Sequence, residues 1–256
     1  MNGHPILELK GVCKSFGGVV TAKDVNFSVH PGEVHGLIGP NGAGKTTIMN
    51  LISGIFETDR GSIFYAGGDI SRTPSHLRAR MGIGRTFQTP RFLHRSSIRD
   101  NLLLGTDLND KIGYWKSFWG VRRTDFQRDL EEIMRHAGFR FDWDDDISSI
   151  PFGQRKLLEI VRAMLTYPKV MLVDEPAAGL TTQEIANARE LLLFAAKQRN
   201  IGILLIEHQM DLVMSTCEHI DVLVFGEIIA SGVPEEIACN PLVLEAYLGR
   251  DYDAEN

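Results

Sequence analysis

Hydrophobic and polar residues alternate in the first part of the chain. Between residues 23 and 30, Val25, Phe27 and Val29 alternate with polar side chains, which is the period of a half-buried strand. A turn at Pro31-Gly32 follows this segment. The further elements predicted here are a strand over residues 33–38, a helix over residues 46–51 and a strand over residues 62–65.

From about residue 88 to residue 165 the pattern becomes helical. Apolar residues recur at helical spacing over residues 124–137, with a capping box from Thr124 to Gln127 and a stop at Gly138. A second helix is predicted over residues 153–165.

After this block the chain returns to strands separated by helices. Apolar strands are predicted over residues 170–173 and 203–206, with a helix over residues 182–199 between them that begins in a Thr181/Glu184 capping box. This alternation predicts a parallel sheet in an α/β fold. The last predicted elements are a hairpin over residues 222–225 and 228–231 and two helices over residues 234–238 and 241–248.

Composition narrows the possible functions. The 256 residues are 43% hydrophobic and 23% charged, which excludes a disordered or collagen-like chain. A net charge of −6 argues against non-specific nucleic-acid binding. The three cysteines lie far apart and predict neither a disulfide framework nor a zinc site. The apolar runs are too short to cross a bilayer and no secretory signal is visible, so we expect synthesis to end in the cytosol.

A phosphate-binding loop follows the strand over residues 33–38. The segment from Gly39 to Thr46 fits G-x-x-x-x-G-K-[ST] between a predicted strand and a predicted helix, a match expected by chance on the order of 0.01 times. Its glycines let backbone N–H groups surround phosphate oxygens, Lys45 neutralises the β and γ phosphates, and the Thr46 hydroxyl binds Mg²⁺. A glycine-rich turn without a ligand is the alternative. The expected nucleotide-binding residues of the loop are Gly39, Pro40, Asn41, Gly42, Ala43, Gly44, Lys45, Thr46 and Thr47.

Two further strands end in residues that suit phosphate chemistry. Asp174 and Glu175 follow residues 170–173, where Asp174 is expected to hold Mg²⁺ and Glu175 to polarise the attacking water. His208 follows residues 203–206 and is expected to contact the γ-phosphate. Taken alone, an acid pair after a strand is common on solvated surfaces, and a lone histidine is more often structural.

With these motifs in place, the chain resembles the ATP-binding subunits of ABC transporters over essentially its whole length. The resemblance makes residues 39–46 the Walker A loop, Asp174-Glu175 the end of the Walker B segment and His208 the switch histidine. It makes Gln88 the Q-loop glutamine, with a part in metal binding and catalysis, and places Phe16 against adenine, although Phe16 alone is equally consistent with a core residue. The signature segment corresponds to residues 150–155 at a helix N-terminus, where Phe152, Gly153 and Gln154 are expected to bind the ATP of the opposite subunit.

Two positions depart from the usual pattern of this family. Pro151 replaces the signature serine, which removes a hydroxyl and a backbone N–H. Thr181 replaces an aspartate of the D-loop, which puts cross-subunit coupling through that side chain in doubt. With these departures the chain is similar to the LivG-type ATPases of branched-chain amino-acid importers. The segments that carry this likeness are residues 84–88, 107–124, 151–154, 175–180, 206–210 and 246–249.

The resemblance implies an α/β fold: a P-loop NTPase with a RecA-like core, an antiparallel β subdomain and an inserted α-helical subdomain. The core corresponds to residues 1–87 and 166–256 and the helical subdomain to residues 88–165. Two such subunits, more readily a heterodimer than a homodimer, would close on Mg-ATP. They would act at the cytoplasmic face of the plasma membrane, with two transmembrane permease subunits and, indirectly, a periplasmic or extracellular solute-binding protein.

Three other functions stay open at this point. A lipopolysaccharide-export ATPase has a similar Tyr-Leu-Gly ending but a serine-containing signature. A soluble ABC protein usually carries two such domains or a long coiled coil, neither of which fits in 256 residues. A non-hydrolysing regulatory module is disfavoured by the presence of both Glu175 and His208.

Two segments are candidates for contact with a membrane partner. Seven arginines and no acidic residue lie between Asp69 and Asp100, and they favour a surface that faces the membrane subunits or anionic headgroups over a merely solvated face. An aromatic cluster over residues 114–119 is expected to pack inside the helical subdomain, with docking against a transmembrane partner as the alternative. The arginines are Arg72, Arg78, Arg80, Arg85, Arg91, Arg95 and Arg99.

Overall fold

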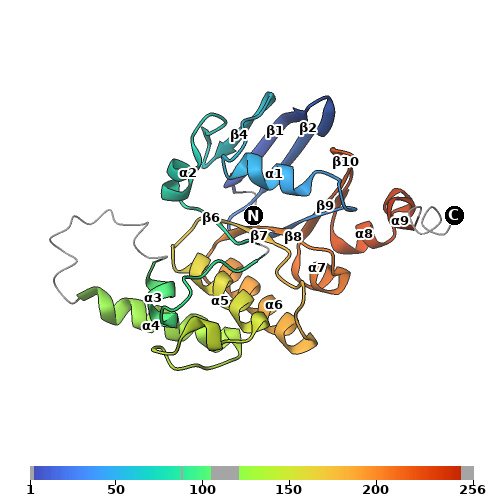
Figure 1. Cartoon of the computed structure of the whole chain (residues 1–256). Coiled ribbons are helices and arrows are strands. Elements are labelled where there is room, and N and C mark those ends of the chain that lie inside the picture. The colour runs from blue at the N-terminus through green and yellow to red at the C-terminus, as the bar shows by residue number, and fades with distance from the viewer. Residues whose placement is uncertain (1–2, 88, 105–120, 249–256) are drawn as a thin grey trace.

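The computed structural model describes residues 3–87, 89–104 and 121–248. Gln88, the aromatic cluster over residues 114–119 and Gly249 lie outside the described residues. The described part forms a small antiparallel sheet, a larger mixed sheet and a helical layer, stacked from top to bottom in Figure 1.

The antiparallel sheet has the strand order β2-β1-β4-β5. Its strands are β1 (Leu7–Phe16), β2 (Val19–Val29), β4 (Arg60–Tyr65) and β5 (Gly68–Asp69). The strand predicted over residues 23–30 therefore begins earlier, and β1 pairs with both β2 and β4.

The larger sheet has the order β10-β9-β3-β8-β7-β6, and only the β9–β10 pair is antiparallel in it. Every residue of β3, β7 and β8 is buried, as expected for strands covered on both faces. The predicted parallel sheet and its terminal hairpin are thus confirmed. The strands are β3 (Val34–Ile38), β6 (Ile83–Arg85), β7 (Val170–Asp174), β8 (Gly202–Ile206), β9 (His219–Val224) and β10 (Glu227–Gly232).

Two hydrophobic cores lie on the two faces of the larger sheet. Helix α1 (Lys45–Ile52) lies between the two sheets, and its apolar side chains pack with β1, β2 and one face of β7 and β8. The other face of the sheet packs against α5 and α6. Consecutive β7 residues divide between the cores, with Leu172 in the first and Val173 in the second, as the period of a strand requires.

The helical layer consists of α3 (Ile98–Leu103), α4 (Val121–Ala137), α5 (Phe152–Met164) and α6 (Thr182–Lys197), with a 3₁₀ turn at Ile147–Ser149. The Thr181/Glu184 capping box of α6 is confirmed. The capping box predicted at Thr124 is wrong, because α4 (Val121–Ala137) already includes the residues before Thr124 in the described part of the chain. The remaining helices are α2 (Ser75–Met81), α7 (Met210–Thr216), α8 (Pro234–Ala238) and α9 (Pro241–Leu248). Among the described residues, no helix combines the length and apolarity needed to cross a bilayer.

Candidate nucleotide-binding and hydrolysis site

The phosphate loop connects β3 to α1 and packs backbone against backbone. A Cβ on Gly39 would lie 2.0 Å from the Leu223 carbonyl oxygen, and a Cβ on Gly44 would lie 2.2 Å from that of Thr21. Both glycines also have φ angles in the left-handed region, at 151° and 111°. The close approach explains why the motif needs glycine at its two ends. On the β9–β10 side, the Gly226 N–H donates to the Ala43 carbonyl over 2.8 Å and holds the loop in place.

Lys45 is buried at the start of α1 and lies over the loop. Its Nζ donates to the carbonyls of Gly39 at 2.6 Å and Pro40 at 3.1 Å. Gly44 precedes the helix without a side-chain cap, so the first N–H groups of α1 face the loop. A cation and a helix N-terminus at one loop form the electrostatic environment that favours a phosphate group. Thr46 and Thr47 follow in the first turn of α1.

Asp174 ends β7 and is 4% exposed. Its backbone N–H donates to the Thr86 hydroxyl, and its Oδ2 lies 3.7 Å from the Arg85 guanidinium. Burial raises the pKa of the Asp174 carboxyl, and the charge of Arg85 opposes this shift. Asp174 Oδ1 is buried without a hydrogen-bond partner among the described residues. Buried polar atoms nearly always have partners, so this oxygen fits the role of a metal ligand. Carboxylate and hydroxyl oxygens are ligands that suit Mg²⁺.

Glu175 and His208 meet at the same edge of the sheet. The His208 ring Nε2 lies 3.1 Å from Glu175 Oε1, and both side chains are partly exposed. Glu175 has a left-handed φ of 47°, and its N–H donates to the Ile206 carbonyl at the end of β8. From α5, the buried Lys156 donates to the Glu175 carbonyl over 2.9 Å. A carboxylate and an imidazole are therefore held next to each other where β7 and β8 end.

Glu207 is a residue of this edge to which the sequence analysis assigns no role. It is 2% exposed, and its carboxylate accepts the backbone N–H groups of Ala177, His208 and Gln209. These bonds join the loop after β7 to the loop after β8. The sequence signal that points to it is a carboxylate at the end of the strand predicted over residues 203–206, directly before His208.

The signature segment lies at the N-terminus of α5, as predicted. Pro151 precedes the helix without a side-chain cap, and Phe152 is 43% exposed. A Cβ on Gly153 would lie 2.2 Å from the Glu184 carboxylate of α6, so a larger side chain there would displace this carboxylate. The N-termini of α5 and α6 therefore lie side by side.

The structure shows the surroundings of Phe16 and corrects the expected surface position of part of the arginine-rich segment. Phe16 is 40% exposed, with its ring edge-on to Phe56 at 5.0 Å between centroids, so it is not a core residue. Arg78 is buried and donates to the Leu51 and Ile52 carbonyls at the end of α1, which makes the surface role predicted for it wrong. Arg85 is also turned inward, but the five other arginines of this segment are exposed.

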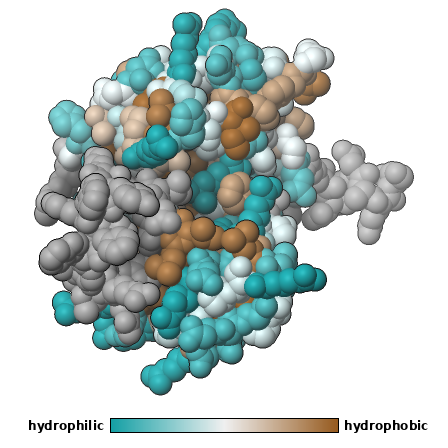
Figure 2. All heavy atoms as spheres, turned by 60° about the vertical axis from the view of Figure 1, so that its left-hand side comes forward, coloured by the Kyte–Doolittle hydropathy of each residue, from teal (hydrophilic) through white to brown (hydrophobic). Residues whose placement is uncertain are grey.

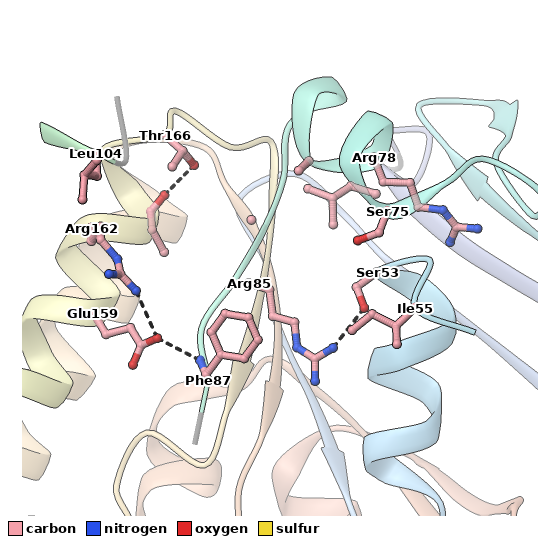
Figure 3. Close-up of a pocket in the computed structure, with 14 residues that line it drawn as sticks. Ser53, Ile55, Ser75, Arg78, Arg85, Phe87, Leu104, Glu159, Arg162 and Thr166 are labelled. Atoms are coloured by element: carbon pink, nitrogen blue, oxygen red, sulfur yellow. Dashed lines mark hydrogen bonds and ion pairs between the residues drawn. The ribbon is translucent and has the colours of Figure 1, made fainter. Parts of the chain in front are cut away.

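A cleft of about 400 Å³ lies beside the site, between the end of α1, α2, β6 and α5. Figure 3 shows Arg85 and Ser53 on one side of it and Glu159 and Arg162 on the other. Figure 2 views this side of the molecule, where apolar surface adjoins hydrophilic surface. Exposed apolar side chains at the cleft include Ile55 and Leu104.

A phosphate loop between β3 and α1, an acid pair at the end of β7 and a histidine after β8 define a P-loop nucleoside triphosphatase. The chain belongs to the ABC transporter family, whose model matches residues 22–178. It is an ATP-binding cassette ATPase, and the fold class expected from the sequence is confirmed. Residues 227–253 match a second model, described as branched-chain amino acid ATP-binding cassette transporter.

Individual relatives agree with this assignment. The chain is 36% identical over 256 residues to the high-affinity branched-chain amino acid transport ATP-binding protein BraF of Pseudomonas aeruginosa, with 96% of this chain and 98% of that protein covered. It is 37% identical to LivG of Escherichia coli K12 with the same coverage, and 32% identical to the lipopolysaccharide export protein LptB of that strain, again covering 96% and 98%. Among solved structures, the ADP conformation of the ABC transporter cassette MJ1267 matches with a TM-score of 0.82 and 30% identity, covering 96% of this chain and all of that chain.

Proposed function

We propose that this chain hydrolyses ATP to drive the uptake of branched-chain amino acids or related small polar solutes. The observation that carries the proposal is the convergence of Lys45, the Asp174–Glu175 pair and His208 on one edge of the sheet. The match of residues 227–253 and the likeness to BraF and LivG support the choice of solute.

Each site residue then has a definite task. Residues 39–47 bind the phosphates, and Thr46, Gln88 and Asp174 hold Mg²⁺. When bound, Mg²⁺ neutralises charge on the phosphoryl group that is transferred. Glu175 polarises the attacking water, and His208 orients Glu175 and contacts the γ-phosphate. The 3.1 Å contact between these two side chains supports this division of roles.

A second ATPase subunit completes the site. Phe152, Gly153 and Gln154 at the start of α5 bind the γ-phosphate held by the partner, and the exposure of Phe152 supports such a contact. Phe16 stacks on the adenine. The partner is a second chain of the same class in a heterodimer or an identical copy in a homodimer, and the helical subdomain of residues 88–165 moves against the core as the two subunits close.

The cleft beside the site and the exposed arginines of residues 72–99 face two transmembrane permease subunits. The exposed apolar side chains of the cleft and the exposed positive charges of that segment suit a partner at a membrane surface. The chain therefore works peripherally at the cytoplasmic face of the plasma membrane, and a solute-binding protein delivers the solute from the other side.

Glu175→Gln tests the catalytic assignment. We expect phosphate release to fall by roughly 10²–10⁴-fold, because the amide does not take a proton from water. ATP should remain bound and stabilise a dimer that gel filtration detects. Glu190→Gln on the exposed side of α6 serves as the matched control. Unchanged turnover in the Glu175 variant would remove this residue from the role of base.

The solute and the partners are tested together. The chain is purified with the permeases encoded beside it, reconstituted in vesicles and assayed for ATP-dependent uptake of leucine, isoleucine and valine. Uptake that depends on a solute-binding protein supports the proposal. Extraction of lipopolysaccharide instead, or co-purification with nucleic acid, contradicts it.

A further inference from the structure

Two charged side chains of α5, one buried and one partly buried, lie at the cleft, away from the phosphate loop. Glu159 is 2% exposed and Arg162 follows it one turn later, with their side chains 3.4 Å apart. Figure 3 shows both pointing from α5 towards the segment that continues from β6. The roles proposed for the Walker and signature residues leave this Glu159–Arg162 pair without a function.

The pair contacts the chain on both sides of residue 88. Glu159 Oε1 accepts the backbone N–H of Phe87 over 3.2 Å. Arg162 donates to the backbone carbonyl of Arg91. The two contacts involve backbone atoms of residues 87 and 91 and thus hold the main chain at these two residues against α5.

Burying the Glu159 carboxylate costs free energy, because the charged group loses contact with water. Burial raises the pKa of the Glu159 carboxyl to about 7, while Arg162, the Phe87 N–H, Lys156 and Arg91 favour its charged form. The burial of this carboxylate is not by itself a gain in stability, because an apolar residue of similar volume often replaces a buried ion pair without loss. A carboxylate at this position supplies what an apolar residue lacks, an acceptor for a backbone N–H.

The same helix contacts two other parts of the site. Its N-terminus is the signature segment at Phe152, and Lys156 donates to the Glu175 carbonyl. Helix α5 is therefore joined by polar contacts to Glu175 just after β7 and to residues 87 and 91.

We propose that the Glu159–Arg162 pair positions the main chain at residues 87 and 91 on α5, so that these two residues, which flank Gln88 in the sequence, move together with the signature helix. Glu159 is a positioning residue that acts through the main chain and does not touch the nucleotide. The inference rests on the proposed function, since it concerns the segment assigned there to Mg²⁺ and to subdomain movement.

The direct test is amide exchange of Phe87, which does not require ATP hydrolysis. In the full chain, Glu159→Ala removes the acceptor, and we expect the Phe87 amide to exchange about tenfold faster. Glu159→Gln keeps an amide oxygen as acceptor and should restore most of the protection. Thr166→Val is the matched control, because Thr166 lines the same cleft and donates to Ala163 in its own turn. Equal exchange in the wild type and both Glu159 variants would overturn the proposal.

The second test measures steady-state hydrolysis in the complete transporter. We expect Glu159→Ala to lower kcat about tenfold with little change in the KM for ATP, and Glu159→Gln to recover most of kcat.

The dependence of kcat on pH gives a further readout. Between about pH 8 and pH 6 the wild type should lose more kcat than Glu159→Gln. Only the wild-type carboxylate, which faces Arg162, Lys156 and Arg91, becomes protonated there. Wild-type kcat and pH profile in both variants would refute the positioning role. A wild-type complex without ATPase activity refutes the proposed function instead, and the exchange test still decides the contact.

Discussion

Glu207 illustrates how one buried carboxylate can order two loops of the site. Its oxygens accept N–H groups from Ala177, at 2.7 Å, and from Gln209, at 3.0 Å, and also the N–H of His208. The loop that carries Glu175 and the loop that carries His208 are thus tied to the same side chain. This link helps to hold Glu175 and His208 in their 3.1 Å contact.

We expect Glu207→Gln to damage both stability and turnover. The amide replaces one acceptor oxygen by a donor that faces a backbone N–H, so the free energy of unfolding should fall by roughly 1–3 kcal/mol. The loss of kcat should exceed any change in the KM for ATP, because the phosphate loop is untouched. Urea denaturation and steady-state kinetics measure the two effects. A variant with normal stability and turnover would show that the three N–H groups do not need a charged acceptor.

Residues with local signatures could be predicted from the sequence, and residues defined by distant partners could not. Lys45, Asp174 and His208 occur in a known spacing, and the structure places Asp174 at the end of β7, His208 just after β8 and Lys45 at the start of α1, over the loop that follows β3. Arg78 was predicted on the surface, yet it reaches carbonyls of α1 that lie 26 and 27 residues away. Nothing in its own segment indicates that contact.

At the scale of elements, the start of α6 connects the D-loop to the signature helix. Thr181 caps α6, and Glu184 closes the capping box by accepting the Thr181 N–H over 2.8 Å. The Glu184 carboxylate also lies directly against Gly153 in α5. The threonine that replaces the usual aspartate therefore has a clear local task at this helix end.

Replacing the cap should separate its structural task from any coupling across subunits. Thr181→Ala removes the cap and should lower the free energy of unfolding by about 1 kcal/mol, whereas Thr181→Asp keeps a good N-cap and should match the wild type. Thermal unfolding of both variants measures this difference. If Thr181→Ala is as stable as Thr181→Asp, the capping box contributes nothing measurable to the fold.

The elements that the sequence analysis missed are those with irregular or short patterns. Strand β1 contains register shifts in its pairing with both neighbours, which break the simple alternation on which the prediction relies. Helix α2 has only seven residues and one buried side chain, Arg78, so it has no apolar periodicity. In contrast, α5 and α6 have long apolar faces, and their predicted starts lie within one residue of the observed ones.

At the scale of the whole molecule, a buried histidine joins two strands of the central sheet. His35 in β3 is 2% exposed, and its Nε2 lies 2.7 Å from Asp221 in β9. Its Nδ1 lies 3.3 Å from Glu33. Burial by itself lowers the pKa of His35, but the two carboxylates outweigh burial and raise it to about 9. The folded chain thus holds a charged imidazolium in its core.

This histidine predicts how global stability depends on pH. Because its pKa is higher in the folded state than the ordinary 6.5, its contribution is complete below pH 6.5 and is lost as the pH rises through about 9. We expect the free energy of unfolding to fall over this interval in the wild type and to fall less in His35→Gln. His76→Gln, at an exposed position of α2, is the control. Urea denaturation at several pH values measures the slopes, and parallel slopes in all three proteins would contradict the assignment.

By itself, the sequence determined the phosphate loop, the strands that end in Asp174 and before His208, and the class of ATPase, because these features depend on the spacing of residues that are close in the chain. Only the tertiary structure decided that Glu159 meets the Phe87 N–H, that Glu207 ties two loops and that Arg78 lies inside. Each of these contacts joins segments that become neighbours only when the sheets and the helical layer pack together. The pattern of residues along the chain does not show which of these distant segments will come into contact.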